Sequence, residues 1–236
     1  MDKTSIDKTS VLDSAIKVST INDLAGDWVN LKYLRSIQKT KSPKISQNVG
    51  QYSYISFNRD TATFVSNFHE WISFNIKSDG TNHFYCMRYD KDTIRMIVSN
   101  DKMTVIHNGI NETYLKYQMC IPNDDWGTWL LNKEIFSGKY LNVDSLNHTV
   151  VFNDDGSVKG FLDFNSYEVM PNYYFAGSEF DILYMKKKPK DKFEYTWIFS
   201  NDTLKIYNLD CQEFDSINNM CVETKIGKLQ YRLIKK

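Results

Sequence analysis

The alternation of apolar and polar residues constrains the fold of this chain more than any other feature. From residue 50 onward the alternation has a period of two, and turn-forming residues recur about every 8 to 12 positions. The turns contain Asn, Asp and Gly, which tolerate tight backbone geometry, as in Asn100-Asp101, Asp154-Asp155-Gly156 and Asn201-Asp202. This pattern predicts an all-β protein whose antiparallel strands form a barrel or a sandwich.

Helical patterns are scarce. Three apolar residues share helical spacing between Asn30, a good N-cap residue, and Pro43; they are Leu31, Leu34 and Ile37. A second short helix is predicted to begin near Asp124 and to carry Trp126 and Trp129. We therefore expect one or two short helices beside the strands.

The charge balance and the N-terminal segment limit the partners of the chain. Its 29 basic and 29 acidic residues create no net basic field, which argues against nucleic acid and anionic membranes as partners. No apolar run approaches the roughly 18 residues of a membrane helix. Residues 1–22 are polar, contain a short direct repeat and are predicted to be a flexible tether. Such a tether fits a cytosolic protein or an exported one whose export segment was removed.

Short motifs recur in the same order in the two halves of the chain. The pairs are Gly26–Asn30 with Gly138–Asn142, Ile97–Asp101 with Ile198–Asp202, and Leu115–Tyr117 with Leu229–Tyr231. The recurrence predicts two tandem, small, antiparallel up-and-down barrels at residues 23–120 and 134–236, with a Trp-rich linker at 121–133. One larger barrel or sandwich is the alternative.

The chain resembles a known family through these motifs. An opening Gly-x-Trp at Gly26-Asp27-Trp28, a short helix after it, a ladder of hairpins and a last strand with an aromatic-basic run are similar to lipocalin and other calycin barrels. The closest resemblance is to lipocalin-like lipoproteins of Gram-negative bacteria. It implies that Trp28 meets Lys116 and that Tyr140 meets Arg232, each closing a barrel by a cation–π contact of about 0.5–2 kcal/mol.

The resemblance also implies a location. An exported protein, periplasmic or tethered to the outer membrane, is expected, and the membrane is reached only through a lipid anchor absent from this chain. A cytoplasmic location stays open.

The four cysteines leave two states open. Cys211 and Cys221 bracket a hairpin loop, where a disulfide would contribute about 3 kcal/mol by the loop-entropy model. Cys86 and Cys120 would then be left for each other. Alternatively, all four cysteines are reduced thiols. Because no two cysteines have CxxC spacing and the four histidines stand far apart, no metal site is predicted.

Aromatic residues give the leading functional hypothesis. Phe193, Tyr195, Trp197 and Phe199 share one face of a predicted strand, where they either line a cavity or fill the barrel interior. The hypothesis is a non-enzymatic protein that binds a small, partly apolar ligand at a barrel mouth. The predicted ligand-binding residues are Tyr167, Tyr173, Tyr174, Tyr184 and Trp197.

A protein-interaction role is the alternative hypothesis. Consecutive aromatic residues at Tyr173-Tyr174-Phe175 could dock on a partner protein, as an inhibitor or immunity-type protein would. The sequence contains no Gly-x-Ser-x-Gly elbow, phosphate loop or dinucleotide fingerprint. We therefore predict no catalytic residues and no cofactor.

Overall fold

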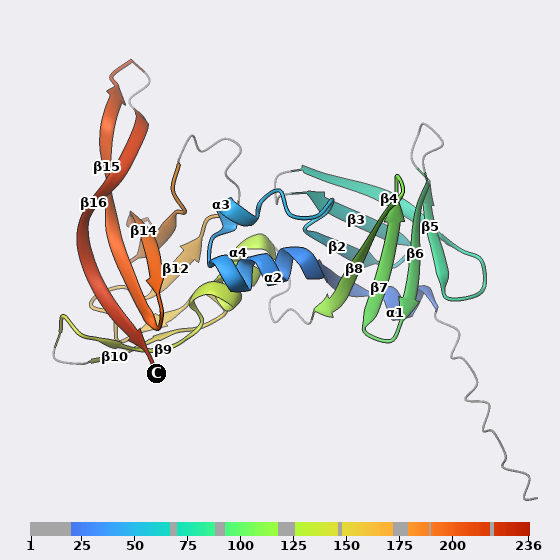
Figure 1. The fold of residues 1–236 in the computed structure, drawn as a ribbon, viewed down its shortest axis with the longest axis horizontal. Coiled ribbons are helices and arrows are strands. Elements are labelled where there is room, and N and C mark those ends of the chain that lie inside the picture. Colours follow the sequence, from blue (N-terminus) through green and yellow to red (C-terminus); the bar gives the residue numbers. More distant parts are fainter. Residues whose placement is uncertain are drawn as a thin grey trace, which may run out of the picture.

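The computed structural model describes residues 20–66, 70–87, 93–117, 126–145, 148–171, 179–188, 190–217 and 220–236. The fold is all-β, as predicted, with a closed eight-stranded antiparallel barrel followed by an eight-stranded antiparallel sheet. Figure 1 shows the two sheets at opposite ends of the molecule with short helices between them.

The first barrel runs up and down in chain order and closes where β1 pairs with β8. It follows helix α1 (Ile21–Leu24), and its strands are β1 (Gly26–Asn30), β2 (Tyr54–Asn58), β3 (Thr61–Ser66), β4 (Glu70–Ser78), β5 (His83–Met87), β6 (Thr93–Ser99), β7 (Lys102–His107) and β8 (Ile110–Tyr117). Every second side chain points inward, as the alternation predicts. Trp28, Phe64 and Phe84 are among the fully buried side chains of its core.

The second sheet has the same up-and-down order, with β9 pairing with β16. Its strands are β9 (Gly138–Asn142), β10 (His148–Phe152), β11 (Val158–Lys159), β12 (Ser166–Val169), β13 (Leu183–Lys186), β14 (Lys192–Ser200), β15 (Thr203–Asp215) and β16 (Met220–Lys235). An isolated bridge between Ser157 and Ser166 joins its two ends, next to β11 and β12. The sheet is therefore barrel-like.

Helix α2 (Leu31–Thr40) begins at the predicted N-cap. The Asn30 side chain accepts hydrogen bonds from the backbone N–H groups of Lys32, at 2.9 Å, and Tyr33, at 3.3 Å. The three remaining helical elements are α3 (Pro43–Ser46), α4 (Trp126–Leu131) and a π-helical turn, η1 (Asn132–Phe136).

The second core extends onto α2 and α4. Tyr33, Leu34 and Ile37 of α2 are buried in the same hydrophobic cluster as Trp129 and the interior of the second sheet. The Trp-rich segment that was predicted as a linker thus contributes buried side chains where the structure describes it.

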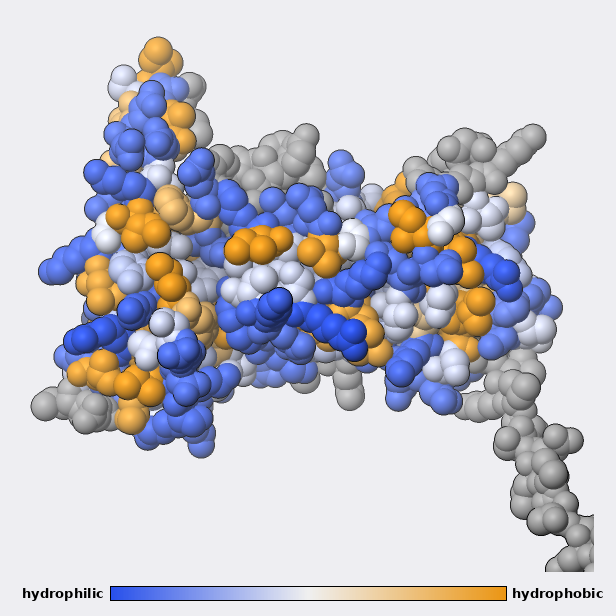
Figure 2. All heavy atoms as spheres, viewed as in Figure 1, coloured by the Kyte–Doolittle hydropathy of each residue, from blue (hydrophilic) through white to orange (hydrophobic). Residues whose placement is uncertain are grey.

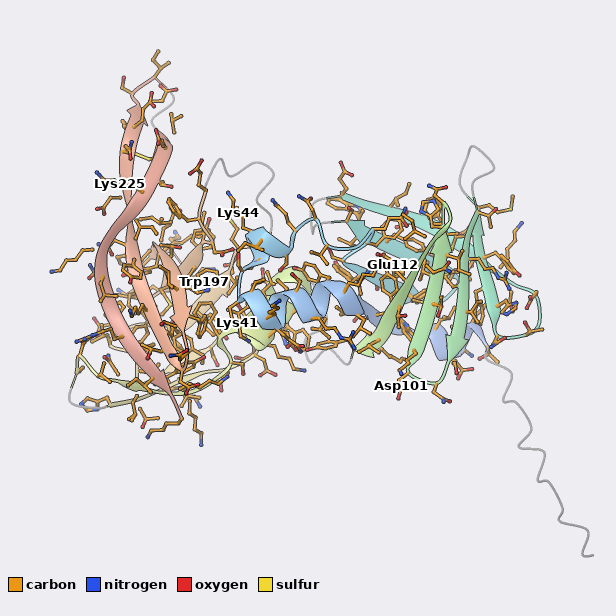
Figure 3. All side chains as sticks on the ribbon, in the orientation of Figure 1. Lys41, Lys44, Asp101, Glu112, Trp197 and Lys225 are labelled. Carbon is orange, nitrogen blue, oxygen red and sulfur yellow. A yellow bond between two sulfur atoms is a disulfide. The ribbon has the colours of Figure 1, made fainter. Side chains whose placement is uncertain are left out.

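Polar contacts also connect α2 with the second sheet. The Trp197 indole donates to the Lys41 carbonyl at 3.0 Å, and the Lys41 ammonium donates to the Glu134 carbonyl at 2.6 Å. Figure 3 shows Lys41 and Trp197 close together at this junction.

One predicted strand is wrong in its length. The alternation predicts a strand over residues 158–164, but β11 ends at Lys159. Gly160 and Leu162 have φ values of +71° and +50°, which are incompatible with an extended strand. The chain turns instead and buries Phe161 and Phe164.

Candidate functional site

Two predicted ligand-binding residues are core side chains. Tyr167 and Trp197 are only 3% and 6% exposed. The Tyr167 hydroxyl donates to the Asn153 carbonyl at 2.7 Å, and its ring centroid lies 5.0 Å from that of Phe152. These two side chains therefore fill the interior of the second sheet. Tyr173 and Tyr174 lie outside the described residues.

Tyr184 lies on the opposite face of the sheet. Its neighbours Leu183 and Met185 are buried, so the alternation along β13 turns Tyr184 outward. The Lys192 ammonium lies 3.2 Å from the centroid of its ring. Burial, with the nearby carboxylates of Glu194 and Glu168, raises the pKa of Tyr184 to about 12. The structure does not bring Tyr184 together with Tyr167 and Trp197, because strand parity separates them.

Aromatic rings in contact run through the interior of the second sheet. The Phe136 ring contacts those of Phe152, Tyr167 and Trp197 at centroid distances of 5.0–5.8 Å. Phe161 continues the series to Phe164 and Tyr231. The chain's own aromatic side chains thus occupy part of the interior of the second sheet.

The first barrel closes around Trp28. Lys116 is the register partner of Trp28, and its ammonium lies 5.5 Å from the centroid of the Trp28 ring. The Trp28 indole donates to the Leu24 carbonyl at 2.8 Å, and the Lys116 ammonium donates to the Asp23 carbonyl at 2.8 Å. Lys116 therefore ties β8 to both Trp28 and α1.

The predicted contact between Tyr140 and Arg232 is wrong. The register partner of Tyr140 is Lys235, three residues further along β16. Arg232 instead forms an ion pair with Asp144, at 2.5 Å between Nη2 and Oδ1. The Tyr140 hydroxyl donates to the Phe136 carbonyl at 2.8 Å, four residues back, as Trp28 does to Leu24.

A long ribbon formed by β15 and β16 is the most prominent surface feature; the sequence predicted a hairpin loop between Cys211 and Cys221 but not the extended paired strands. β14 pairs with β15 only as far as Asn208. From Leu209 to Ile226, the two strands pair with each other, and no other described strand pairs with this segment. Figure 1 shows this two-stranded ribbon rising beyond the other strands of the sheet. We call residues 209–226 the ribbon.

A disulfide joins the two strands of the ribbon. Cys211 and Cys221 are bonded, with their Cα atoms 5.7 Å apart. An isolated two-stranded hairpin is only marginally stable in water, so the covalent link restrains a segment that lacks support from neighbouring strands. Cys86 is a free, buried thiol whose pKa burial raises to about 12. Cys120 lies outside the described residues.

The ribbon exposes large apolar side chains. The exposed fractions are 58% for Phe214, 92% for Ile217, 50% for Val222 and 40% for Ile226. Figure 2 shows hydrophobic and hydrophilic residues side by side at the far end of the ribbon. Exposed apolar side chains on a projecting segment are typical of interaction surfaces.

Acidic residues surround these apolar side chains. The ribbon contains four carboxylates, those of Asp210, Glu213, Asp215 and Glu223, against one lysine, Lys225. Asp210 and Lys225 are register partners, so the excess negative charge lies toward the tip. This surface combines exposed apolar groups with a negative field.

The described residues offer no metal centre and no membrane helix. Among them, no group of three or more His, Cys, Asp or Glu side chains could hold a metal ion. No helix within the same ranges is both long and apolar enough to cross a membrane. Comparison with protein-family models, with curated proteins and with solved structures finds no match for this chain.

Proposed function

We propose that this protein is a non-enzymatic interaction module that docks on a partner protein through the ribbon. The observation that carries the proposal is the projection of a disulfide-linked hairpin with Phe214 and Ile217 exposed at its end. A hairpin held in one conformation loses little conformational entropy on binding, which favours affinity. Its apolar side chains would be the energetic centre of the interface.

The charge of the ribbon specifies the partner's chemistry. The partner presents an apolar pocket rimmed by Lys or Arg, because the carboxylates around Phe214 would be repelled by an acidic rim. Opposite charges also raise the association rate and make it depend on salt. The same carboxylates disfavour insertion into an anionic membrane.

The aromatic contacts inside the second sheet support this role over the leading hypothesis from sequence, a small apolar ligand at a barrel mouth. Tyr167 and Trp197, which would contact such a ligand, already contact other parts of the chain. Binding of a small ligand stays a prediction, and the predicted residues Tyr173 and Tyr174 lie outside the described part of the chain.

We also propose an exported location. The disulfide supports an oxidising compartment, such as the periplasm, because cytosolic thiols are kept reduced. A lipoprotein of the lipocalin-like kind would fit this compartment.

The two sheets are further proposed to be copies of one module. Trp28 and Tyr140 each donate to a carbonyl four residues back. Each has a lysine as a register partner, Lys116 for Trp28 and Lys235 for Tyr140. The backbone N–H of Lys116 donates to the carbonyl of Asp101, and that of Lys235 to the carbonyl of Asp202; both aspartates lie in turns. These matched contacts favour a tandem repeat.

A crosslinking experiment tests the docking proposal. A photo-reactive amino acid at Ser216 of the oxidised protein is used to capture the partner from cell-envelope extract, and the partner is then identified and purified. Phe214→Ser and Ile217→Ser should each weaken binding of the purified partner about tenfold or more, as expected for apolar hot spots.

Met87→Ser is the matched control, because Met87 is 56% exposed on the first barrel and lies outside the ribbon. It should leave the affinity unchanged. A purified partner that binds both ribbon variants as tightly as the original protein would refute docking through the ribbon.

A further inference from the structure

Two glutamates on the ribbon lie directly opposite each other. Glu213 of β15 and Glu223 of β16 are register partners, and both side chains are exposed. Like charges at directly opposed positions of an antiparallel pair are destabilising. The disulfide between Cys211 and Cys221 holds the two strands together against this repulsion. A cation supplied by a partner would relieve the repulsion, so the glutamate pair fits a basic group on the molecule that binds there.

The connection between β13 and β14 carries the opposite charge. Residues 186–192 contain one aspartate and five lysines, which are Lys186, Lys187, Lys188, Lys190 and Lys192. We call these five lysines the basic hairpin. Two of them form ion pairs within the same sheet, Lys186 with Glu168 at 2.6 Å and Lys187 with Asp163 at 3.2 Å. Lys188 and Lys190 are exposed, so they offer positive charge to another molecule.

An exposed aromatic ring lies beside the basic hairpin. Phe193 is 41% exposed, and its ring contacts the buried ring of Phe164 at a centroid distance of 5.7 Å. The Lys187 ammonium lies 5.6 Å from the centroid of the Phe193 ring and 5.5 Å from that of Phe164. The chain thus presents an apolar centre with a lysine rim. This is the chemistry that the apolar and acidic ribbon requires of its partner.

The basic hairpin lies beside the base of the ribbon. β14 starts at Lys192, close to Tyr195, and Tyr195 pairs with Asn208, the residue just before the ribbon. The ribbon strand from Leu209 to Asp215 spans about 20 Å. Two ribbons that lie antiparallel, each with its tip at the base of the other, would therefore bring each tip to the basic hairpin of the other copy.

We infer that the ribbon docks on a second copy of this chain and forms a two-fold symmetric dimer. The inference rests on the proposed docking role of the ribbon and names its partner. Phe214 would contact Phe193 of the partner subunit, and the two glutamates would pair with lysines of its basic hairpin. A two-fold axis makes each contact twice and closes the assembly. Because the net charge of the chain is zero, no long-range repulsion keeps two copies apart.

The first experiment measures the mass of the oxidised full chain in solution. Sedimentation velocity and light scattering follow the chain from about 1 µM to about 300 µM, a range that brackets weak and moderate dissociation constants. We expect a species with twice the mass of one chain to appear as the concentration rises. Raising NaCl from about 50 mM to about 500 mM should weaken the dimer several-fold, because salt screens exposed charges.

Exchanging charges between the two surfaces gives the sharper test. Glu213→Lys/Glu223→Lys puts cations on the ribbon as well as the hairpin, and Lys188→Glu/Lys190→Glu puts carboxylates on both. Each variant alone should self-associate about tenfold or more weakly. An equimolar mixture should form a heterodimer, because both contacts then join opposite charges again. Lys102→Glu, which reverses an exposed charge on β7, is the matched control and should dimerise normally. Thermal unfolding verifies that each variant is folded.

Three results would overturn the inference: a chain that stays monomeric at all concentrations, a dimer that persists in both charge variants, or a mixture of the two variants that does not associate. If the chain is monomeric but a probe at Ser216 crosslinks to a different protein, and Phe214→Ser weakens that binding, only the second copy is rejected and docking through the ribbon stands. Absence of both self-association and a captured partner would refute the docking role itself.

Discussion

Asp27 shows how a single side chain makes stability depend on pH. It faces outward on β1, where Ser56 and Tyr117 are its register partners. Burial raises the pKa of Asp27 to about 6, and a hydrogen bond from Ser56 opposes this effect only in part. The folded state therefore holds this proton more tightly than the unfolded state, whose carboxyl has a pKa near 3.8.

The first prediction concerns Asp27→Asn. Because ionisation is unfavourable in the folded state, the contribution of Asp27 to stability falls as the pH rises from about 4 through 6. The variant should thus be more stable than the original protein at pH 8 and should lose this advantage near pH 4. Urea unfolding at several pH values measures the difference. A gain in stability of Asp27→Asn that is the same at all pH values would contradict a raised pKa of Asp27 in the folded state.

The second prediction concerns Asn30. Besides capping α2, its side-chain amide donates to the buried Glu112 carboxylate at 2.9 Å, which also accepts from the Gln51 N–H at 2.9 Å. Asn30→Ala should destabilise the protein by about 2–4 kcal/mol, because the helix loses its cap and a buried carboxylate loses a donor. Chemical denaturation checks this value. Asn58→Ala, an exposed residue on β2, is the control and should change stability little.

A double variant isolates the coupling between the two side chains. In Asn30→Ala/Glu112→Gln the loss should be smaller than the sum of the two single losses, because the residues share one interaction. Strict additivity would show that the cap alone accounts for the effect of Asn30.

At the scale of elements, the ribbon and the strands that support it differ in stability. Up to Asn208, β15 lies between β14 and β16, whereas from Leu209 onward it has β16 as its one described partner. Register shifts interrupt the ladder at the base of the ribbon, near Tyr207, and within it, around Glu213. The disulfide therefore acts on a locally unstable segment.

The third prediction concerns this disulfide. In Cys211→Ser/Cys221→Ser, amide hydrogen exchange should become faster at residues 209–226, while Leu204 and Leu233, which are fully buried, keep their protection. The midpoint of global unfolding should change little, since the ribbon can open without the barrel. Exchange measured by mass spectrometry separates the two regions. Loss of protection throughout the second sheet would contradict this view.

The elements also show what the sequence could predict. Inward and outward alternation is local, so it located most strands, and Asn30 marked the start of α2. The hairpin at Cys211 and Cys221 was predicted, but the extended strands of the ribbon were missed because residues 209–226 have no core side to impose an alternating pattern. The partner of Tyr140 was misassigned because the family resemblance placed Arg232 there, whereas β9 pairs with Leu233–Lys235 at the end of β16.

The candidate sites were less predictable than the fold. Aromatic residues such as Tyr167 and Trp197 occur at inward strand positions both in a filled core and in the wall of a cavity. The residue types alone therefore do not distinguish these two roles. Tyr184 was grouped with them although one step of strand parity places it on the other face. For Cys211 and Cys221, the hairpin spacing identified the pair, but the redox state was left open.

At the scale of the whole molecule, α2 belongs to both halves. It follows β1 of the first barrel directly, and yet Tyr33 and Ile37 are buried in the core of the second sheet. The two sheets therefore share a packed element, so their stabilities should be coupled.

The fourth prediction tests that coupling. Ile37 is fully buried, so Ile37→Ala should destabilise the protein by about 2–5 kcal/mol through the cavity that it leaves. Hydrogen exchange should report the loss in both β1 and β14. Phe84→Ala, in the core of the first barrel, is the control for a change remote from the junction. An effect of Ile37→Ala confined to one half would contradict the coupling.

Strand β16 begins at the tip of the ribbon and ends beside β9, the first strand of the second sheet. A tensile force on a partner-bound tip is therefore carried along one continuous strand to the Leu233–Lys235 pairs with β9. Hydrogen bonds loaded parallel to their strands must break together rather than one at a time. Under the proposed docking, the molecule would resist pulling at the tip of the ribbon, a mechanical property that an interior pocket would not need.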